Sequence, residues 1–229
     1  ILILKTKIMI KYYIIFIFTF VLADIKQPDN MITILGTTNV LGEIDPCGWK
    51  KKPLGGLARK ATVIENLINN NESPIIVDAG DLYFKKDTLD PGVTLDVAMI
   101  NADIITESFN AMGCDAFSPG SKDFAAGVDF LFNQYKKSDF PYVSCNIYDL
   151  NDELLFEPYI IKELRGKRIG IIGLASHFES SELIIKDPIT TLEKYINQLE
   201  DSVDFILLLF NASQADLNIL HNKNLPVDM

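Results

Sequence analysis

Histidine and cysteine, the side chains best suited to transition-metal binding and thiol chemistry, are scarce in this sequence. Only two histidines and three cysteines occur among its 229 residues. We expect both histidines, His177 and His221, to be surface or loop residues. An odd cysteine count allows at most one disulfide within the chain. Cys114 and Cys145 lie in apolar surroundings, which predicts ordinary core residues.

Basic charge is also in short supply. The chain has 21 Lys and Arg against 31 Asp and Glu. Three of the lysines fall within residues 1–23, so the remainder carries 18 basic against 31 acidic side chains, a formal charge of −13. Duplex binding relies on cation-rich surfaces, so this balance excludes nucleic acid as a partner.

The N-terminal apolar run is too short to span a bilayer comfortably and has the pattern of a signal peptide. Met9 is the expected true start, Lys11 supplies the positive region, residues 12–22 are apolar, and cleavage is expected before Asp24. Residues 1–23 are therefore predicted to direct export to the periplasm or the extracellular space. The alternative is a retained N-terminal anchor, which would be the chain's only membrane contact.

Past Asp24, apolar β-rich runs alternate with segments of helical period, which predicts an α/β domain over residues 24–229. Met229 follows a turn-like stretch, "NLPVD", so we expect this domain to be truncated at its C-terminal end. "IIKELRGKRIGIIG" predicts a hairpin that turns at or beside Arg165 and Gly166. The expected strands are 31–35, 75–77, 116–118, 142–147, 169–174 and 205–210, and the expected helices are 56–68, 94–112, 128–136 and 189–199.

Polar clusters follow four of the expected strands. They read "TTN", "DAGD", "PGSKD" and "FNAS" in chain order. Loops at the carboxyl ends of strands in such sheets converge on a common crevice where ligands bind. We therefore expect these clusters to form one site.

Several blocks of sequence resemble the calcineurin-like metallophosphoesterases, and most closely the exported 5′-nucleotidase branch. The blocks include "ILGTTNVLGEID", "LGGLARKATVI", "IIVDAGD", "FNAMGCDAFSPGSKDFAAGVDFL" and "KRIGIIGL". The resemblance runs from about Met31 to Asp228 and implies a four-layer αββα sandwich. It also implies two divalent metal ions, which generate hydroxide and clamp the attacking and leaving oxygens of a phosphate ester.

The metal-ligand positions that the resemblance identifies are mostly substituted. Asp81 matches the bridging aspartate, whereas the Asp-x-His of the first block is replaced by Asn39 and Leu41. The metal-binding asparagine is replaced by Ser121, and a later histidine by Asn211. One carboxylate with neutral neighbours should not hold two dications, which need several negative charges close by. We therefore expect a degraded dinuclear site.

Lys122 occupies the position where the family has a histidine that helps to stabilise the transition state. We hypothesise that its ammonium contacts Asp81 and replaces the metal ions as the neutralising charge, because a buried carboxylate needs a positive partner or a proton. The alternative is a lysine that points to solvent.

Cys47 lies in "DPCGW", directly after the substituted turn. This stretch is similar to divergent nucleotidase-like (seleno)proteins, which carry Pro-Cys-Gly followed by cysteine or selenocysteine. Here the following residue is Trp49, so either the redox pair is lost or a UGA codon has been translated as tryptophan. A thiol or redox role of Cys47 follows only in the second case or through a mixed disulfide.

The sequence thus predicts an exported, 5′-nucleotidase-like protein that is non-hydrolytic, either binding a ligand or partner or linked to thiol chemistry through Cys47. The alternative is a divalent-metal-dependent phosphohydrolase that acts on nucleotides or related phosphate esters. Nucleotides or phosphate esters are the expected small-molecule partners in both cases. Asn110 and Asn146 have two interpretations, as crevice residues or as turn and cap residues.

Overall fold

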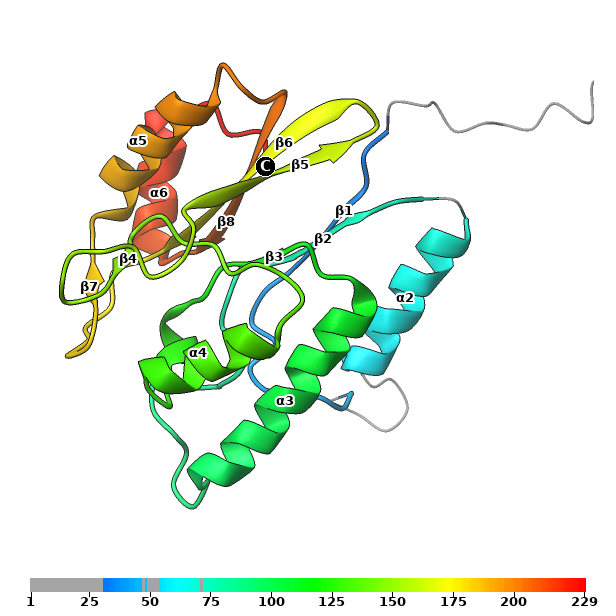
Figure 1. The fold of residues 1–229 in the computed structure, drawn as a ribbon, viewed down its shortest axis with the longest axis vertical. Coiled ribbons are helices and arrows are strands. Elements are labelled where there is room, and N and C mark those ends of the chain that lie inside the picture. Colours follow the sequence, from blue (N-terminus) through cyan, green and yellow to red (C-terminus); the bar gives the residue numbers. More distant parts are fainter. Residues whose placement is uncertain (1–30, 47, 49–53, 71) are drawn as a thin grey trace, which may run out of the picture. The chain divides into compact units, whose positions relative to one another are not determined.

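The computed structural model describes residues 31–46, 48, 54–70 and 72–229. Ile32–Met229 forms one compact unit, and strands alternate with helices along it (Figure 1). The elements are β1 (Ile34–Thr37), α2 (Leu57–Asn69), β2 (Ile75–Asp78), α3 (Leu95–Met112), β3 (Ala116–Phe117), the 3-10 helix η1 (Ser121–Phe124), α4 (Val128–Lys137), β4 (Ile147–Tyr148), β5 (Tyr159–Leu164), β6 (Lys167–Ala175), β7 (Ile184–Ile185), α5 (Pro188–Leu199), β8 (Phe205–Asn211) and α6 (Gln214–Lys223).

The first sheet consists of β1, β2 and β3 in that order, and all three strands are parallel. Its central strand, β2, is buried along its whole length, as a continuous apolar run predicts for a parallel strand. β1 begins three residues later than the expected 31–35 and extends through Thr37, whose Cα pairs with that of Asp78.

The second sheet has the order β5-β6-β8. The predicted hairpin is present: β5 and β6 are antiparallel, and Arg165 and Gly166 turn between them with φ of 51° and 74°. Two successive positive φ angles match the twist of a tight hairpin. β8 runs parallel to β6 from the Ile169–Phe205 pair to the Ala175–Asn211 pair.

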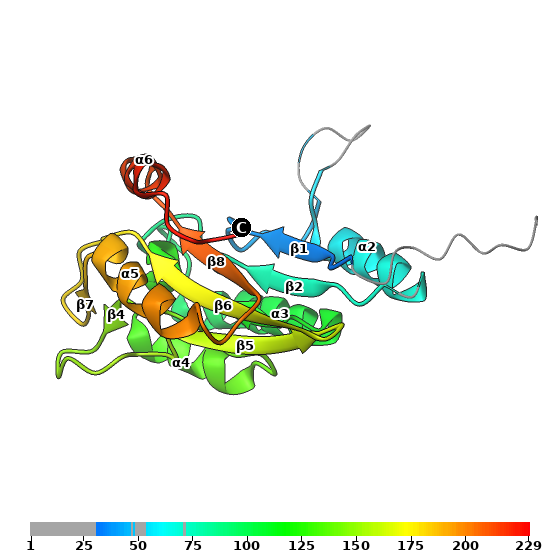
Figure 2. The same cartoon turned by 90° about the horizontal axis from the view of Figure 1, so that it is seen from above.

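The alternation of side chains along β2 explains how the two sheets pack. Ile75 and Val77 contact residues of the second sheet such as Ile171 and Leu209, whereas Ile76 faces the helices α2, α3 and α4. Successive strand residues point to opposite faces, so one strand supplies both cores. On the second sheet, Ile172 and neighbouring residues pack against α5, which covers the other side of that sheet (Figure 2).

The ends of two helices follow capping rules that are readable in the sequence. α3 ends at Gly113, which takes the left-handed conformation with φ 71°. Before α5, Asp187 accepts a hydrogen bond from the Thr190 amide at 2.8 Å, and Pro188 occupies the first helical position.

The expected strand at 142–147 was wrong in its middle. Tyr142 and Val143 form only isolated bridges, and regular pairing resumes at β4. Between them the backbone bonds several separate segments, at Glu157, Gly173 and Lys186, and the buried Asn146 side chain adds bonds to the backbone of Ala175 and Lys186. The sequence prediction also missed β7, η1 and α6. Among the described residues, no helix is long and apolar enough to cross a membrane.

Candidate functional site

Four loops meet at the carboxyl ends of the strands, as the polar clusters predicted. The amides of Asn39 and Leu41 donate to the carbonyls of Gly80 and Asp81, each at 2.9 Å. A Cβ placed on Gly80 would lie 2.8 Å from the Gly120 nitrogen and 3.2 Å from Cβ of Asn211. The loops after β1, β2, β3 and β8 are therefore in van der Waals contact.

Lys122 and Asp81 form an ion pair at the centre of these loops. Nζ of Lys122 lies 2.6 Å from Oδ2 of Asp81, and the Lys122 amide donates to Oδ1 at 3.3 Å. The carboxylate is nearly buried, with 6% of its side chain exposed, and the lysine side chain is 26% exposed. The expected contact is present, and the alternative of a solvent-directed lysine was wrong.

Asn211 also belongs to this centre. A Cβ on Gly120 would lie 2.4 Å from Oδ1 of Asp81 and 2.6 Å from Cγ of Asn211. Gly120 therefore allows the carboxylate and the amide to approach one another across its backbone. The φ of Gly120 is −96°, so the close approach of these side chains, and not its backbone angle, is what requires a glycine there.

Asn39 and Ser121 engage other partners. The exposed Asn39 side chain donates to Oγ1 of its neighbour Thr38 at 3.1 Å. Oγ of Ser121 donates to Oδ1 of Asp87 at 2.8 Å. Of the five substituted or retained ligand positions that the sequence predicted, the side chains of Asp81 and Asn211 approach one another, and Lys122 contacts Asp81.

Backbone strain marks the same loops. Asn39, Leu41 and Asp81 all have positive φ, of 54°, 57° and 56°. The left-handed region costs an L-residue about 1 kcal/mol or more and is concentrated at functional sites. The Leu41 side chain has no polar atom to compensate, so only its backbone bond to the Asp81 carbonyl offsets this cost. Three strained residues in two adjoining loops therefore mark this part of the chain as a candidate functional site.

Asp123 was not singled out as a functional residue from the sequence, yet it organises the centre. Its fully buried carboxylate accepts four backbone N–H bonds, from Gly120, Asp81, Leu82 and Tyr83, at 2.7 to 2.9 Å. Burial raises the pKa of the Asp123 carboxyl to about 7, against the lowering effect of these amides. Asp123 therefore fixes the backbone that carries Asp81.

A second buried carboxylate, Asp78, was also missed. Oγ1 of Thr37 donates to Oδ2 of Asp78 at 2.6 Å and accepts from Nζ of Lys60 at 2.8 Å. Burial raises the pKa of Asp78 to about 6 and lowers the pKa of Lys60. The Lys60 ammonium also lies 3.8 Å from the ring centroid of Phe109. These contacts connect α2 to the first sheet. Asp78 is the first aspartate of "DAGD", and this motif is the feature of the sequence that could have indicated it.

The remaining predicted residues have structural roles. The amide of Asn110 donates to the Lys137 carbonyl at 2.9 Å, and its Oδ1 accepts from the Asp139 amide at 2.8 Å. Asn110 and Asn146 are therefore turn and bridging residues rather than crevice residues. His177 and His221 are exposed, as expected.

Cys114 and Cys145 are free and buried in the core, as expected, and burial raises the pKa of each thiol to about 12. Cys47 and Trp49 lie outside the described residues. The predicted thiol role therefore stays a prediction.

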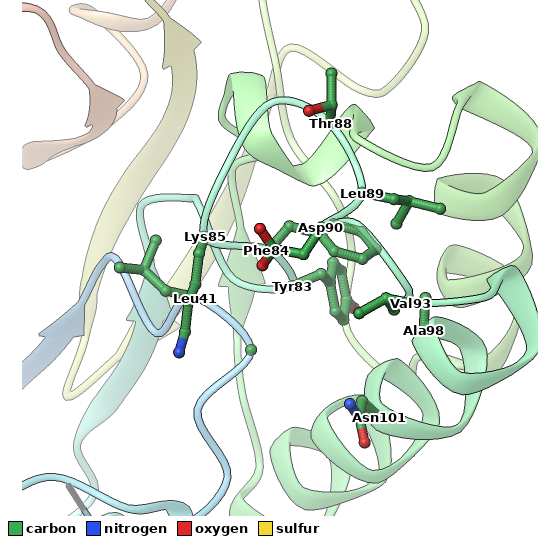
Figure 3. Close-up of a pocket in the computed structure, with 11 residues that line it drawn as sticks. Leu41, Tyr83, Phe84, Lys85, Thr88, Leu89, Asp90, Val93, Ala98 and Asn101 are labelled. Carbon is green, nitrogen blue, oxygen red and sulfur yellow. The ribbon is translucent and has the colours of Figure 1, made fainter.

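A cavity of about 190 Å³ adjoins the first turn. Figure 3 shows Leu41 and Lys85 on one side of it and Ala98 and Asn101 of α3 on the other. Its lining mixes apolar and polar side chains, and Lys85 forms an ion pair with Glu43. Leu41 contributes an apolar side chain to this lining.

Known proteins are similar in sequence to most of this chain, although no family model matches it. The chain is 27% identical over 218 residues to the 5′-nucleotidase of Bos taurus, covering 86% of this chain and 37% of that protein. It is 24% identical over 226 residues to the 2′,3′-cyclic-nucleotide 2′-phosphodiesterase/3′-nucleotidase of Salmonella typhimurium, covering 89% and 35%. This chain is a homologue of the 5′-nucleotidases.

Solved structures agree with this homology at the level of fold. The 5′-nucleotidase precursor from Thermus thermophilus superposes with a TM-score of 0.70 at 22% identity, covering 82% of this chain and 38% of that one. The calcineurin-like phosphoesterase YfkN from Bacillus subtilis gives 0.67 at 22% identity, covering 86% and 70%. The nucleotidase homologue spans about a third of the length of the curated relatives named above.

The described donor set of this nucleotidase homologue does not fit a pair of divalent cations. Asp81 is the one carboxylate at the centre whose oxygens face Lys122, Leu41 carries no donor atom, and Ser121 is bonded to Asp87. Within residues 31–46, 48, 54–70 and 72–229, no group of three His, Cys, Asp or Glu side chains is arranged to hold a metal ion. Paired dications repel one another and need several anionic oxygens nearby.

Proposed function

We propose that this 5′-nucleotidase homologue is an exported, non-hydrolytic protein that binds a nucleotide or a related phosphate ester at the degraded centre. The Lys122–Asp81 ion pair carries the proposal. The ammonium supplies one positive charge where the resemblance implies two dications. The pair is neutral overall, and each oxygen of the Asp81 carboxylate already accepts a hydrogen bond from Lys122.

The neighbouring donors support binding rather than hydrolysis. Lysine is a strong point-charge partner for a phosphate, and Asn211 offers an amide beside it. A bound phosphate would compete with Asp81 for the ammonium, and no activated water is needed for such binding. The names of the relatives describe enzymes that act on nucleotides, which makes nucleotides the first ligands to test.

Two further parts of the proposal concern architecture and location. The face-to-face contact of the two sheets, with helices packed on their other faces, supports a four-layer αββα sandwich. The N-terminal pattern of Lys11 followed by an apolar run supports export. A thiol-linked variant of the function centres on Cys47, and the codon at position 49 decides whether a selenocysteine stands beside it.

The decisive experiment measures metal content and turnover on the same sample. The purified protein is incubated with Mn²⁺, Zn²⁺ or Co²⁺, desalted and analysed for bound metal, and then assayed with AMP and bis(p-nitrophenyl) phosphate. We expect less than one equivalent of tightly bound metal and no turnover above buffer. Two bound ions with turnover that Asp81→Ala abolishes would establish the divalent-metal-dependent phosphohydrolase instead.

Binding is tested separately by titrating AMP into metal-free protein in the presence of EDTA. We expect saturable binding that weakens in Lys122→Met and is unchanged in Lys86→Met, whose lysine lies in an exposed pair with Asp90. A flat titration would remove the nucleotide from the proposal.

A further inference from the structure

A groove that neither Lys122 nor Asp81 lines runs along the N-terminal end of α4. Two cavities form it, of about 250 Å³ and 460 Å³, and both are lined by Val128 and Glu182. The smaller cavity reaches Ser121 of η1, and the larger one reaches Leu150 and Leu154 beyond β4. Because they share lining residues, the two cavities adjoin one another, and we refer to them together as the groove.

Apolar side chains make up one part of the lining of this groove, which we call its floor. Phe124 and Phe178 stack with ring centroids 5.6 Å apart at the first cavity. Phe132 and Leu154 line the second, and Leu150 leaves 65% of its surface exposed there. A large exposed leucine beside a hollowed apolar floor is typical of a surface that a partner covers.

The walls of the groove are acidic and carry no basic side chain. None of the lining carboxylates pairs with a lysine or arginine among the residues that the structure describes; the lining carboxylates are Asp87, Asp129, Asp149, Glu153, Glu179 and Glu182.

The carboxylates of Asp129 and Glu153 differ from the others because they have no hydrogen-bond partner in the described part of the chain. The others have local ones: Asp87 accepts from Ser121, and Asp149 accepts from the amides of its own turn. Burying such walls under an apolar partner would leave anions desolvated and unpaired, which is costly. The occupant must therefore bring positive charge as well as apolar surface.

We propose that this groove docks a basic, amphipathic peptide segment of a partner protein. Apolar side chains of the segment cover Leu150 and the phenylalanine floor, and its lysines or arginines pair with the acidic walls. The carboxylates do not converge as metal ligands do, and anionic ligands are repelled. This proposal does not depend on whether the Lys122–Asp81 centre binds or hydrolyses nucleotides.

The probe is a fluorescein-labelled peptide of alternating leucine and lysine, titrated into the full chain and followed by fluorescence anisotropy. A leucine–glutamate peptide of equal length tests the sign of the charge. Spermine tests whether charge without apolar surface is sufficient. We expect saturable binding of the leucine–lysine peptide alone, and affinity that falls with added salt because exposed charges are screened.

Matched variants separate the groove from the general negative charge of the protein. The double change Asp129→Asn and Glu153→Gln should weaken peptide binding about fivefold, because it removes two solvent-exposed charge pairs between the groove and the peptide. The control, Asp201→Asn with Glu65→Gln, removes one exposed Asp and one exposed Glu elsewhere and should leave affinity unchanged.

A second matched pair tests the apolar floor. Leu150→Ser should weaken binding about tenfold, because a leucine side chain then loses its buried contact with the peptide. Ile100→Ser, a change of a 60% exposed residue on α3, is the control and should have no effect.

Equal losses in groove and control variants would overturn the proposal, and so would equal binding of the glutamate peptide or of spermine. The proposal would also be overturned if the free protein self-associates and the groove variants abolish that self-association. The groove would then bind a second copy of this chain.

Discussion

The ammonium of Lys122 lies 2.6 Å from Oδ2 of Asp81, and the two residues are 41 positions apart in the sequence. The pair joins the loop after β2 to the start of η1, and its carboxylate is nearly buried. Breaking such a pair leaves a charge with poor access to water, whereas removing both charges does not. This asymmetry provides the first prediction.

Lys122→Met should destabilise the protein by about 1–2 kcal/mol, after allowance for the partial exposure of the lysine. The double variant Lys122→Met with Asp81→Asn should recover most of that loss. Urea unfolding of the four proteins in the double-mutant cycle measures the coupling. Lys86→Met, which breaks an exposed pair, should change stability by less than about 0.5 kcal/mol. A coupling no larger than that control would show that Lys122 does not neutralise Asp81.

Restoring the ligands that the resemblance implies should restore metal binding. The reconstructed variant carries Asn39→Asp, Leu41→His, Ser121→Asn, Lys122→His and Asn211→His. Backbone strain at positions 39, 41 and 81 is already present, so the turn does not need to be rebuilt. Mn²⁺ at 100 times its Kd should then raise the free energy of unfolding by about 2.7 kcal/mol, measured by thermal melting with and without metal.

The same reconstruction with Asp81→Asn is its control. Without the bridging carboxylate the metal-dependent stabilisation should disappear. If the original chain is stabilised by Mn²⁺ as strongly as the reconstructed one, the substitutions at these positions have not removed the metal site.

Asp123→Asn should cost about 3 kcal/mol, because an amide has one acceptor oxygen for four backbone donors and brings two donors of its own. Asp129→Asn, an exposed change six residues along, should be within about 0.5 kcal/mol of the original protein. Both are measured by urea unfolding at pH 7. Equal, small effects of the two changes would remove Asp123 from its organising role.

Thiol labelling tests the remaining cysteine prediction. With burial raising the pKa of Cys114 and Cys145 to about 12, their thiolate fraction at pH 8 is about a thousandfold below that of a free cysteine. Iodoacetamide should therefore label neither in the folded protein on a timescale that labels glutathione, and both after unfolding. Mass spectrometry of the peptides shows whether Cys47 labels first; equal sluggishness of all three thiols would end its proposed redox role.

Where a single residue pattern decides the local structure, the sequence predicted it well. Buried Ile75–Val77, the Arg165–Gly166 turn and the apolar spacing of α3 needed no long-range information. The strand at 142–147 failed because its backbone bonds several separate segments and the Asn146 side chain bonds the backbones of Ala175 and Lys186, which are 29 and 40 residues away. α6 was missed because none of its residues is buried, so it has no strong apolar period.

The site was predicted unevenly for a similar reason. The resemblance pointed to Asp81, Lys122 and Asn211, and these do meet. It could not indicate that Asn39 and Ser121 turn to Thr38 and Asp87, since both bonds depend on rotamers that the surrounding contacts select. Asp123 was overlooked because its partners are four backbone amides. Backbone amides are common to nearly all residues, so the sequence does not indicate which of them bind a given side chain.

The cap of α5 gives a pH-dependent prediction. The Asp187 carboxylate accepts the Thr190 amide bond, and this backbone hydrogen bond lowers the pKa of Asp187. A lowered folded-state pKa means that the stabilisation is present above the unfolded value of about 3.9 and is lost as the pH falls through the folded pKa. Asp187→Ala should therefore cost about 1 kcal/mol at pH 7 and progressively less below pH 4, measured by urea unfolding across that range.

Asp187→Asn is the control that separates the charge of the carboxylate from the capping hydrogen bond, because its amide oxygen accepts the same bond without titrating. Its stability should remain near that of the original protein at pH 7. The difference in stability between Asp187→Asn and Asp187→Ala should not change with pH. A cost of Asp187→Ala that is constant from pH 7 to pH 3 would show that this carboxylate does not stabilise the helix in its charged form.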